Sequence, residues 1–368
     1  NNVNNTNNVN NTNNVNNTNN VNNTTPEVCD NDTDDDGDGD IDCEDSDCLT
    51  SAQCGRWLYT QDNKIHTPSG AVWAGRGANL HDTRSCNRCA WNEPVVAEVI
   101  RRADALIDDW GADYIRLLLE AYPDSGGRVH WENAISDSDY LADMVEVVEH
   151  IGTKPGAYVL IALWQDPSFD DLGWPTEETV TLWRLLAQTF MEYDHVMFGL
   201  VNEPQANYDG SLDADCHAAM TAAVTAIREE EDLAGSPRHI ITVQGTRGWA
   251  RTLDYYVTNP ITAYEGENIA YETHVYNPEE DFYSQFELPS ETLPVVIGEF
   301  GPAEGYMTTD DCQALITAAA TLQIPWLAWT FHQRCAPNLL ETGDNECDGM
   351  PLIPTAWGQI IKDALLQK

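Results

Sequence analysis

Two glutamates each follow an apolar run that is typical of a buried strand. Glu203 lies in the string VNEP at residues 201–204, and Glu299 lies in the string IGEFG at residues 297–301. A carboxyl group at such a place needs a partner or a function, because burying an unpaired charge is costly. Two carboxyl groups, one protonated and one ionised, are the minimum equipment for cleaving a glycosidic bond. The sequence therefore predicts a glycoside hydrolase with Glu203 and Glu299 as its catalytic pair.

The elements that must position this pair form an alternating pattern from residue 55 onward. Eight short runs are apolar without polar alternation, which is typical of parallel strands covered on both faces. They span residues 71–74, 114–119, 158–164, 196–201, 240–244, 269–274, 294–298 and 326–331. Helical periodicity predicts helices at residues 95–110, 141–151, 177–191, 213–230, 310–322 and 356–366. Residues 55–368 are thus expected to fold as an α/β domain, a (β/α)8 TIM barrel.

A barrel of this kind carries its active site on the loops that follow the strands. Further polar and aromatic residues lie at or near the predicted strand ends. They are Arg116, Asn202, His274, Tyr276 and Trp329.

These strand ends, in their order along the chain, resemble glycoside hydrolase family 5, within the large clan of retaining glycosidases. The resemblance covers the whole predicted barrel. It implies that Glu203, after the fourth strand, is the general acid/base and that Glu299, after the seventh, is the nucleophile. Retention of the anomeric configuration is likewise an implication of the family.

The same resemblance implies roles for the other strand-end residues. Arg116 and Tyr276 would contact the nucleophile and keep it ionised. Asn202 would hydrogen-bond the 2-hydroxyl of the sugar, and His274 would help to shape the same subsite. Trp329 would form the apolar floor on which the reacting sugar ring stacks.

The chain departs from the family pattern after the third strand, where members usually carry a histidine. Trp164 occupies this region instead and adds stacking surface. His81, after the first strand, matches another recurrent element of the family. Trp174 and Trp249 lie in loops near predicted strand ends, where they either line a cleft that grips several sugar rings or cap the barrel core.

The net charge limits the classes of partner. The chain has 61 acidic and 18 basic residues, which gives a formal net charge of −43. Such a surface repels the phosphate backbone, so nucleic acid is excluded as a partner. The excess of carboxylates fits either an ordinary solvated surface or adaptation to high salt. No apolar stretch approaches the roughly 18 residues of a membrane span.

Ten cysteines favour an extracellular or cell-surface location, where disulfides form. The even number allows five bridges, and the spacing of Cys86 and Cys89 without a second pair favours disulfides over zinc. We expect at least one bridge to join the loops after the first and eighth strands, which contain Cys86, Cys89, Cys335 and Cys347.

Residues 1–25 form a tail that contains four copies of the hexapeptide NNVNNT. Asparagine competes with regular backbone hydrogen bonding and the repeat offers little apolar area, so a flexible polar spacer is one interpretation. The other is self-assembly, because asparagine ladders with regularly spaced β-branched residues can stack between chains. Each repeat also contains an Asn-x-Thr acceptor site for glycans.

Residues 26–54 form a segment dense in aspartate and cysteine. Oxygen ligands at alternate positions with glycine at the sixth are typical of calcium loops, although position twelve is Cys43 rather than the glutamate of an ordinary calcium hand. The segment resembles the short aspartate-rich calcium repeats of bacterial surface proteins, and distantly thrombospondin type 3 repeats. The predicted calcium ligands are Asp32, Asp34, Asp36, Asp38, Asp40 and Asp42. No cofactor is expected for catalysis.

The leading hypothesis is a secreted retaining hydrolase of β-1,4-linked polysaccharide. The family analogy places cellulose-type glucan first and mannan second. The competing hypothesis is a filament or adhesin subunit that assembles through the tail and the calcium segment, with the barrel as a carbohydrate-binding or enzymatic decoration.

Overall fold

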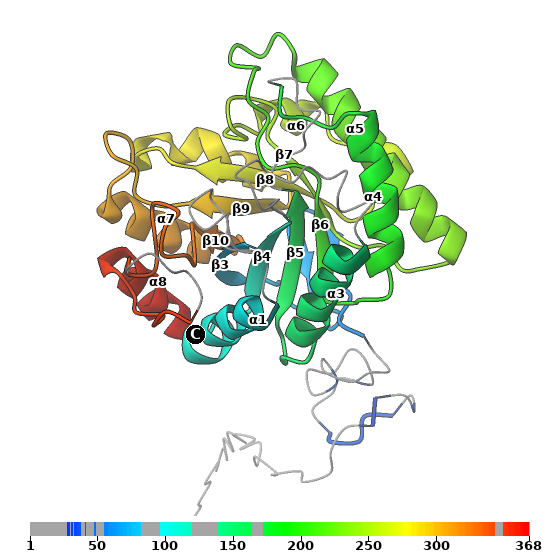
Figure 1. Cartoon of the computed structure of the whole chain (residues 1–368). Helices are drawn as coiled ribbons and strands as arrows, with labels where there is room; N and C mark the ends of the chain where they lie inside the picture. The colour runs from blue at the N-terminus through cyan, green and yellow to red at the C-terminus, as the bar shows by residue number, and fades with distance from the viewer. Residues whose placement is uncertain are drawn as a thin grey trace, which may run out of the picture.

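A closed barrel of eight parallel strands forms the body of the protein (Figure 1). The computed structural model describes residues 28, 29, 31, 33–37, 41, 48, 55–81, 96–119, 138–163, 172–342 and 349–367. The strand order around the barrel is β10-β3-β4-β5-β6-β7-β8-β9, and every neighbouring pair is parallel. Helices surround the strands, so the prediction of a (β/α)8 barrel is confirmed.

Seven of the eight predicted strands overlap barrel strands of the structure. The barrel strands are β3 (Arg76–His81), β4 (Tyr114–Leu119), β5 (Tyr158–Leu163), β6 (Val196–Gly199), β7 (Ile241–Gln244), β8 (Ile269–Val275), β9 (Val295–Phe300) and β10 (Trp326–Ala328). A short antiparallel hairpin of β1 (Tyr59–Gln61) and β2 (Lys64–His66) precedes them and was not predicted.

All six predicted helices are present in the structure. They correspond to α1 (Val96–Asp104), α3 (Ser138–Gly152), α4 (Glu177–Phe190), α5 (Asp213–Ala234), α7 (Thr309–Leu322) and α8 (Ala356–Leu366). The short helix α6 (Asp254–Thr258) was not predicted. Shorter turns are η3 (Ala105–Asp109), η4 (Ala263–Gly266), η5 (Glu279–Asp281), η6 (Tyr283–Glu287) and η7 (Pro289–Glu291). The predicted helix at residues 95–110 is continued by the π-helical turn η3 rather than being one regular helix. Among the described helices, none is long and apolar enough to cross a membrane.

The prediction for the first barrel strand was wrong. The apolar run at residues 71–74 precedes the barrel, and β3 takes the first place instead. The run is apolar because Trp73 packs its ring edge-on against Tyr114 and Tyr158, with centroids 4.9 and 5.3 Å away. It therefore contributes to the apolar cluster inside the barrel. The true strand contains arginine, asparagine and histidine, so its composition hid it.

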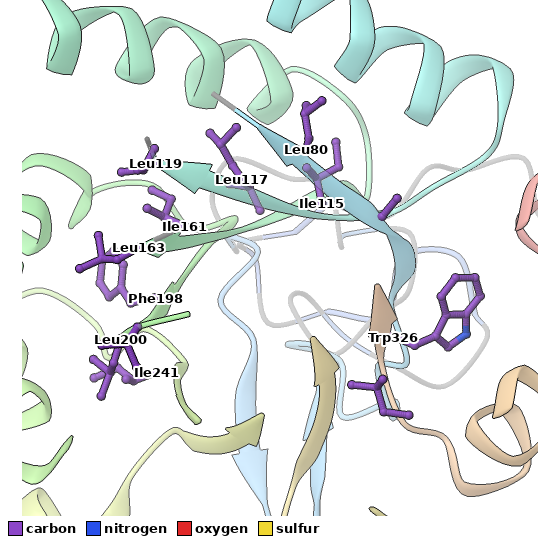
Figure 2. Close-up of a cluster of buried hydrophobic side chains, with 14 of the residues drawn as sticks. Leu80, Ile115, Leu117, Leu119, Ile161, Leu163, Phe198, Leu200, Ile241 and Trp326 are labelled. Atoms are coloured by element: carbon purple, nitrogen blue, oxygen red, sulfur yellow. The ribbon is translucent and has the colours of Figure 1, made fainter. Parts of the chain in front are cut away.

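The side chains of the barrel strands alternate between two environments, as the period of a strand requires. On β4 the outward residues Ile115, Leu117 and Leu119 join the main core between strands and helices (Figure 2). The inward residues Tyr114, Arg116 and Leu118 stack as successive layers inside the barrel. Arg116 therefore lies in the middle of its strand, and not at its end as the sequence suggested.

A bulge between β8 and β9 changes which side chains face inward. Thr273 pairs with Ile297, but the next residue, His274, pairs with Glu299, so Gly298 is passed over. An extra residue in one strand shifts its side-chain alternation locally. The bulge thereby lets Glu299 join the inward-facing residues of the barrel.

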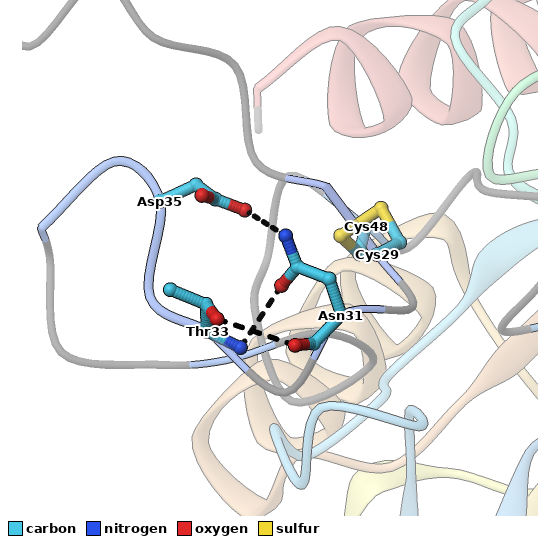
Figure 3. Close-up of a disulfide and its surroundings, with 5 residues drawn as sticks. All are labelled: Cys29, Asn31, Thr33, Asp35 and Cys48. Carbon is cyan, nitrogen blue, oxygen red and sulfur yellow. Dashed lines mark hydrogen bonds between the residues drawn. A yellow bond between two sulfur atoms is a disulfide. The ribbon is translucent and has the colours of Figure 1, made fainter.

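The cysteines only partly follow the prediction. Cys29 and Cys48 form a disulfide with an S–S length of 2.02 Å (Figure 3). Cys335 is also disulfide-bonded. Cys216 on α5 and Cys312 on α7 are free, so five bridges do not form. Both free thiols are buried in the main core, where cysteine packs as a small apolar residue. The expected bridge between the two loops involves Cys86, Cys89 and Cys347, which lie outside the described residues.

Candidate active site

Glu203 and Glu299 meet at the mouth formed by the carboxyl ends of the barrel strands. Glu203 follows β6, and Glu299 is the fifth residue of β9. One carboxylate oxygen of each glutamate and one ring nitrogen of His274 all lie within 4.8 Å of one another. Glu203 is half-buried, whereas Glu299 is buried. The two carboxyl groups can therefore act on the same small group of atoms.

Arg116 connects most of this site. Its guanidinium donates to Glu299 Oε1 at 2.8 Å and to Asn202 Oδ1 at 3.1 Å. It also donates to Asn79 Oδ1 at 2.9 Å, and its Nε lies 3.1 Å from Glu272 Oε1. The side chain is fully buried, so its positive charge is compensated by carboxylates rather than by water. Arg116 is thus placed to stabilise negative charge on Glu299.

Several neighbours act on the proton affinity of Glu299. Burial raises the pKa of Glu299 most, and the nearby Glu203 raises it further. His274, Arg116 and the Tyr276 hydroxyl, which donates to Oε2 at 3.0 Å, act in the opposite direction. The site therefore combines a desolvated carboxylate with directed donors, a combination that suits a nucleophile. Because Arg116 already supplies Glu299 with positive charge, we interpret this cluster as an acid–base site rather than a metal site.

His274 lies between carboxylates on both sides of its ring. Its Nδ1 is 2.7 Å from Glu203 Oε1, and its Nε2 is 3.1 Å from Glu272 Oε1. Glu299 Oε2 is 3.6 Å from Nδ1. Burial alone lowers the pKa of His274, but the surrounding carboxylates outweigh it and raise the pKa to about 9. The proton that Nδ1 holds or shares with Glu203 is therefore present at neutral pH.

Glu272 on β8 also lies in this site, although the sequence did not point to it. Its carboxylate is completely buried and accepts from Thr242 Oγ1 at 2.5 Å and from Gln244 Nε2 at 2.8 Å. Burial raises its pKa, but Arg116, His274 and the Thr242 hydroxyl outweigh burial and lower the pKa to about 2. The alternation of side chains along a strand could have revealed Glu272, because a residue two positions before His274 faces the same side of the strand.

An aromatic wall adjoins Glu299. Trp329 directly follows β10, is joined to Thr330 by a cis peptide bond and is 5% exposed. Tyr276 packs against the small apolar cluster that contains Trp329. His81, the last residue of β3, has its ring edge-on to Trp329, with centroids 5.5 Å apart. The predicted residues Arg116, Asn202, His274, Tyr276, Trp329 and His81 therefore all lie in or beside the site, whereas Trp164 lies outside the described residues.

The two loop tryptophans have different environments. Trp174 is buried in the main core, which matches the capping interpretation. The neighbouring Gly173 has a φ of +76°, and an added Cβ would come within 2.3 Å of the backbone oxygen of Glu203. This segment therefore packs directly against the turn that carries Glu203. Trp249 is 38% exposed and donates its backbone N–H to Pro204 O at 2.7 Å.

An exposed aromatic pair lies on the same side as Glu203. The ring of Tyr208, which is 64% exposed, is edge-on to Trp249 with centroids 5.4 Å apart. The Arg251 guanidinium lies 5.5 Å from the Trp249 ring. Arg247 and Asp213 form an ion pair that ties the loop after β7 to the first residue of α5. Tyr208 was missed in the sequence because an isolated loop tyrosine carries no pattern.

The predicted calcium segment is described only in part. Asp34 and Asp36 are described, whereas Asp32, Asp38, Asp40 and Asp42 lie outside the described residues. Asp34 Oδ1 accepts from the Gly37 N–H at 2.6 Å. Asn31 donates to Asp35 Oδ2 at 2.7 Å, as Figure 3 shows. The predicted tail, residues 1–25, also lies outside the described residues.

Comparisons with known proteins agree with this geometry. Residues 72–334 match the model of the family described as "Cellulase (glycosyl hydrolase family 5)". A search of curated protein sequences found no match.

Several solved structures share the fold. Cellulase Cel5C_n has 20% identity and a TM-score of 0.66, with 85% of this chain and 93% of that chain covered. The catalytic domain of Thermobifida fusca endoglucanase Cel5A has 21% identity and a TM-score of 0.65, with 84% and 97% covered. A β-mannanase from Streptomyces thermolilacinus has 19% identity and a TM-score of 0.59, with 84% and 95% covered. At these identities the likeness concerns the fold alone.

Proposed function

Because the chain belongs to glycosyl hydrolase family 5 and is a glycosidase, we propose that it hydrolyses a β-1,4-linked polysaccharide. Cellulose-type glucan is the first candidate substrate and mannan the second. The family description and the cellulase, endoglucanase and β-mannanase among the structural neighbours support this order. Glu203 and Glu299 at the barrel mouth are the observation that carries the proposal.

We propose double displacement with retention of configuration. Retaining enzymes have carboxyl groups about 5–5.5 Å apart, whereas inverting enzymes need about 6.5–9.5 Å to admit a water molecule. The 4.8 Å limit on the Glu203 and Glu299 oxygens favours the first class. Glu299 attacks the anomeric carbon while Glu203 protonates the leaving oxygen. Glu203 then removes a proton from water, which releases the sugar from Glu299.

The surrounding residues bind the sugar at the point of cleavage. Asn202, which Arg116 fixes through its side-chain oxygen, presents its amide nitrogen to the 2-hydroxyl. Trp329 forms the apolar floor, and His81 beside it contributes to hydroxyl recognition. Trp164 adds stacking surface after β5. His274 acts on Glu203 directly, as its 2.7 Å contact supports.

Incubation with a panel of glucans, mannans and xylans tests the function. We expect release of reducing ends from a β-1,4-glucan, and proton NMR should detect the β-anomer as the first product. Inactivity on all β-linked substrates would refute the proposed function. An α-anomer as the first product would refute double displacement alone.

We expect Trp249 and Tyr208 to bind a sugar ring on the leaving-group side of the cleft. Replacing Trp249 with alanine should raise KM for long cello-oligosaccharides about tenfold, which corresponds to about 1.4 kcal/mol of lost stacking. The value of kcat should change little, because the catalytic pair is untouched. Steady-state kinetics on oligosaccharides of increasing length measures the effect. Tyr283→Ala, which removes an exposed ring from η6, serves as the control and should leave KM unchanged.

We also propose that residues 26–54 bind calcium and that the enzyme acts outside the cell. Carboxylate oxygens such as those of Asp34 and Asp36 are the ligands that calcium prefers. The Cys29–Cys48 disulfide supports an oxidising location. We expect a saturable heat when calcium is titrated into the chelator-treated protein, and its absence would refute the calcium site. The family match does not favour a non-catalytic filament or adhesin subunit.

A further inference from the structure

We propose that Glu272 is a positioning residue for the hydrolytic reaction. Its buried carboxylate holds the His274 ring and thereby controls the proton that His274 shares with Glu203. The proposal rests on the proposed function, because it concerns how Glu203 obtains its proton.

Both carboxylate oxygens of Glu272 have polar partners, and one of these partners is the ring of His274. Oε1 is 3.1 Å from both His274 Nε2 and Arg116 Nε, and Oε2 accepts from Thr242 and Gln244. The carboxylate is completely buried, so each of these contacts replaces water that a charged group otherwise needs. Glu272 is therefore an ionised carboxylate whose position is fixed by its own strand β8, by the neighbouring strand β7 and by Arg116 of β4 across the barrel.

The barrel makes room for this carboxylate in a specific way. A Cβ atom at Gly298 would lie 2.1 Å from Glu272 Oε1, so any side chain there would displace Glu272. Gly298 is the residue that the β8–β9 bulge passes over. Gln244, which donates to Glu272, also accepts from the backbone N–H of Val201 at 3.1 Å. The same network thus reaches the strand end that carries Glu203.

The arrangement determines where the proton of the Glu203 and His274 pair resides. With Nε2–H directed at the Glu272 carboxylate, Nδ1 is the ring atom that faces Glu203. One proton lies between Nδ1 and Glu203 Oε1, either on the ring or on the carboxyl group. When Glu203 gives its proton to the leaving oxygen, His274 remains neutral with its proton on Nε2. An ionised Glu272 favours the ring-bound position and so retains this proton to higher pH.

The charged groups around the pair define the pH dependence. His274 is faced by Glu203 from the loop after β6, by Glu272 from its own strand and by Glu299 from β9. Glu272 is faced by Arg116 and Tyr114 from β4 and by His274. Three carboxylates raise the pKa of His274 to about 9, although burial opposes them. Removing one carboxylate must lower that pKa.

The variant Glu272→Gln tests this role, because it preserves shape and removes charge. We expect the alkaline limb of the kcat/KM profile on a β-1,4-glucan to move down by at least about one pH unit. At pH values above the limb this shift amounts to about a tenfold loss of activity. NMR of histidine labelled with ¹⁵N should give a matching decrease in the pKa of His274, whose signal is identified by its loss in His274→Asn. An unchanged limb and an unchanged His274 pKa would overturn the proposal.

The chain offers a matched control at the opposite end of the barrel. Glu231 is also a fully buried carboxylate held by an arginine and a histidine, at 2.7 Å from Arg228 Nη1 and 2.9 Å from His239 Nδ1. Glu231→Gln should lower the unfolding temperature without moving the alkaline limb. If Glu272 only stabilised the fold, Glu272→Gln would likewise lower the unfolding temperature without moving the alkaline limb.

The NMR measurement still tests the proposal if the variant does not fold or if the wild type is inactive. If Glu272→Gln does not fold, the wild-type spectrum still decides, because Nε2 of His274 must stay protonated across the whole pH range. A neutral ring with a bare Nε2 would overturn the proposal. If the wild type cleaves no glycan, the proposed function fails, while the His274 titration still tests the effect of Glu272.

Discussion

Replacing Glu299 with glutamine is expected to lower kcat on the substrate polysaccharide by at least about 10⁴-fold. The amide has the shape of the carboxylate but cannot form the glycosyl ester that double displacement requires. It also removes the negative charge that Arg116 and the Tyr276 hydroxyl now contact at 2.8 and 3.0 Å. Initial rates of reducing-end release, measured with a large excess of enzyme, are sensitive enough to detect a loss of this size.

A control separates this loss from unfolding. Glu304→Gln makes the same substitution at an exposed residue in the loop after β9 and should leave kcat unchanged. The circular dichroism spectrum of Glu299→Gln should match that of the wild type at 25 °C. Wild-type rates in a correctly folded Glu299→Gln enzyme would remove Glu299 from the mechanism.

Replacing Glu203 with glutamine is expected to affect the two chemical steps differently. On polysaccharide, kcat should fall by about 10²–10⁴-fold, because the sugar leaving group needs a proton. On an aryl glycoside with an acidic phenol, the first step needs no proton and should remain fast. The second step lacks its general base, so the reaction should give a burst of phenol followed by slow turnover.

Azide provides a further test of Glu203. A small anion can enter the space near residue 203 and attack the glycosyl enzyme without a general base. It should therefore accelerate the slow phase of Glu203→Gln and yield a glycosyl azide, whereas the wild type should not respond. Equal losses on both kinds of substrate, with no effect of azide, would contradict the acid/base assignment of Glu203.

The acid limb of the kcat/KM profile should lie at a higher pH than the pKa of an ordinary glutamate in water. Burial and the neighbouring Glu203 raise the pKa of Glu299, so its ionised form is lost at a higher pH than in water as the solution is acidified. The wild-type profile should thus be bell-shaped, with Glu299 on the acid side and His274, whose raised pKa is about 9, on the alkaline side.

The fold could be predicted because a parallel barrel leaves a strong local signature. Strands such as β4 and β5 are apolar along their whole length, and helices such as α4 and α8 have clear periodicity. The same local logic failed for the first strand. Apolarity suggested burial, but of the run at residues 71–74 only Trp73 is buried, inside a barrel to which the run contributes no strand.

The free cysteines show a similar limit of prediction from the sequence. An even number of cysteines permits five bridges, but a bridge needs Cα atoms within about 7 Å of each other. Cys216 and Cys312 lie on the core sides of two helices, α5 and α7, and remain thiols. Pairing depends on distances that no spacing in the sequence encodes.

The sequence by itself determined the strand ends, and with them Glu203 and Glu299, because all parallel strands of a barrel present their carboxyl ends at one mouth. Only the tertiary structure decided which buried charges meet. The β8–β9 bulge turned Glu299 inward, Gly298 left space for Glu272, and barrel closure brought Arg116 within reach of both carboxylates. Arg116 and Glu299 are 183 positions apart in the sequence, and the strength of their ion pair depends on a low-dielectric interior that exists only after folding.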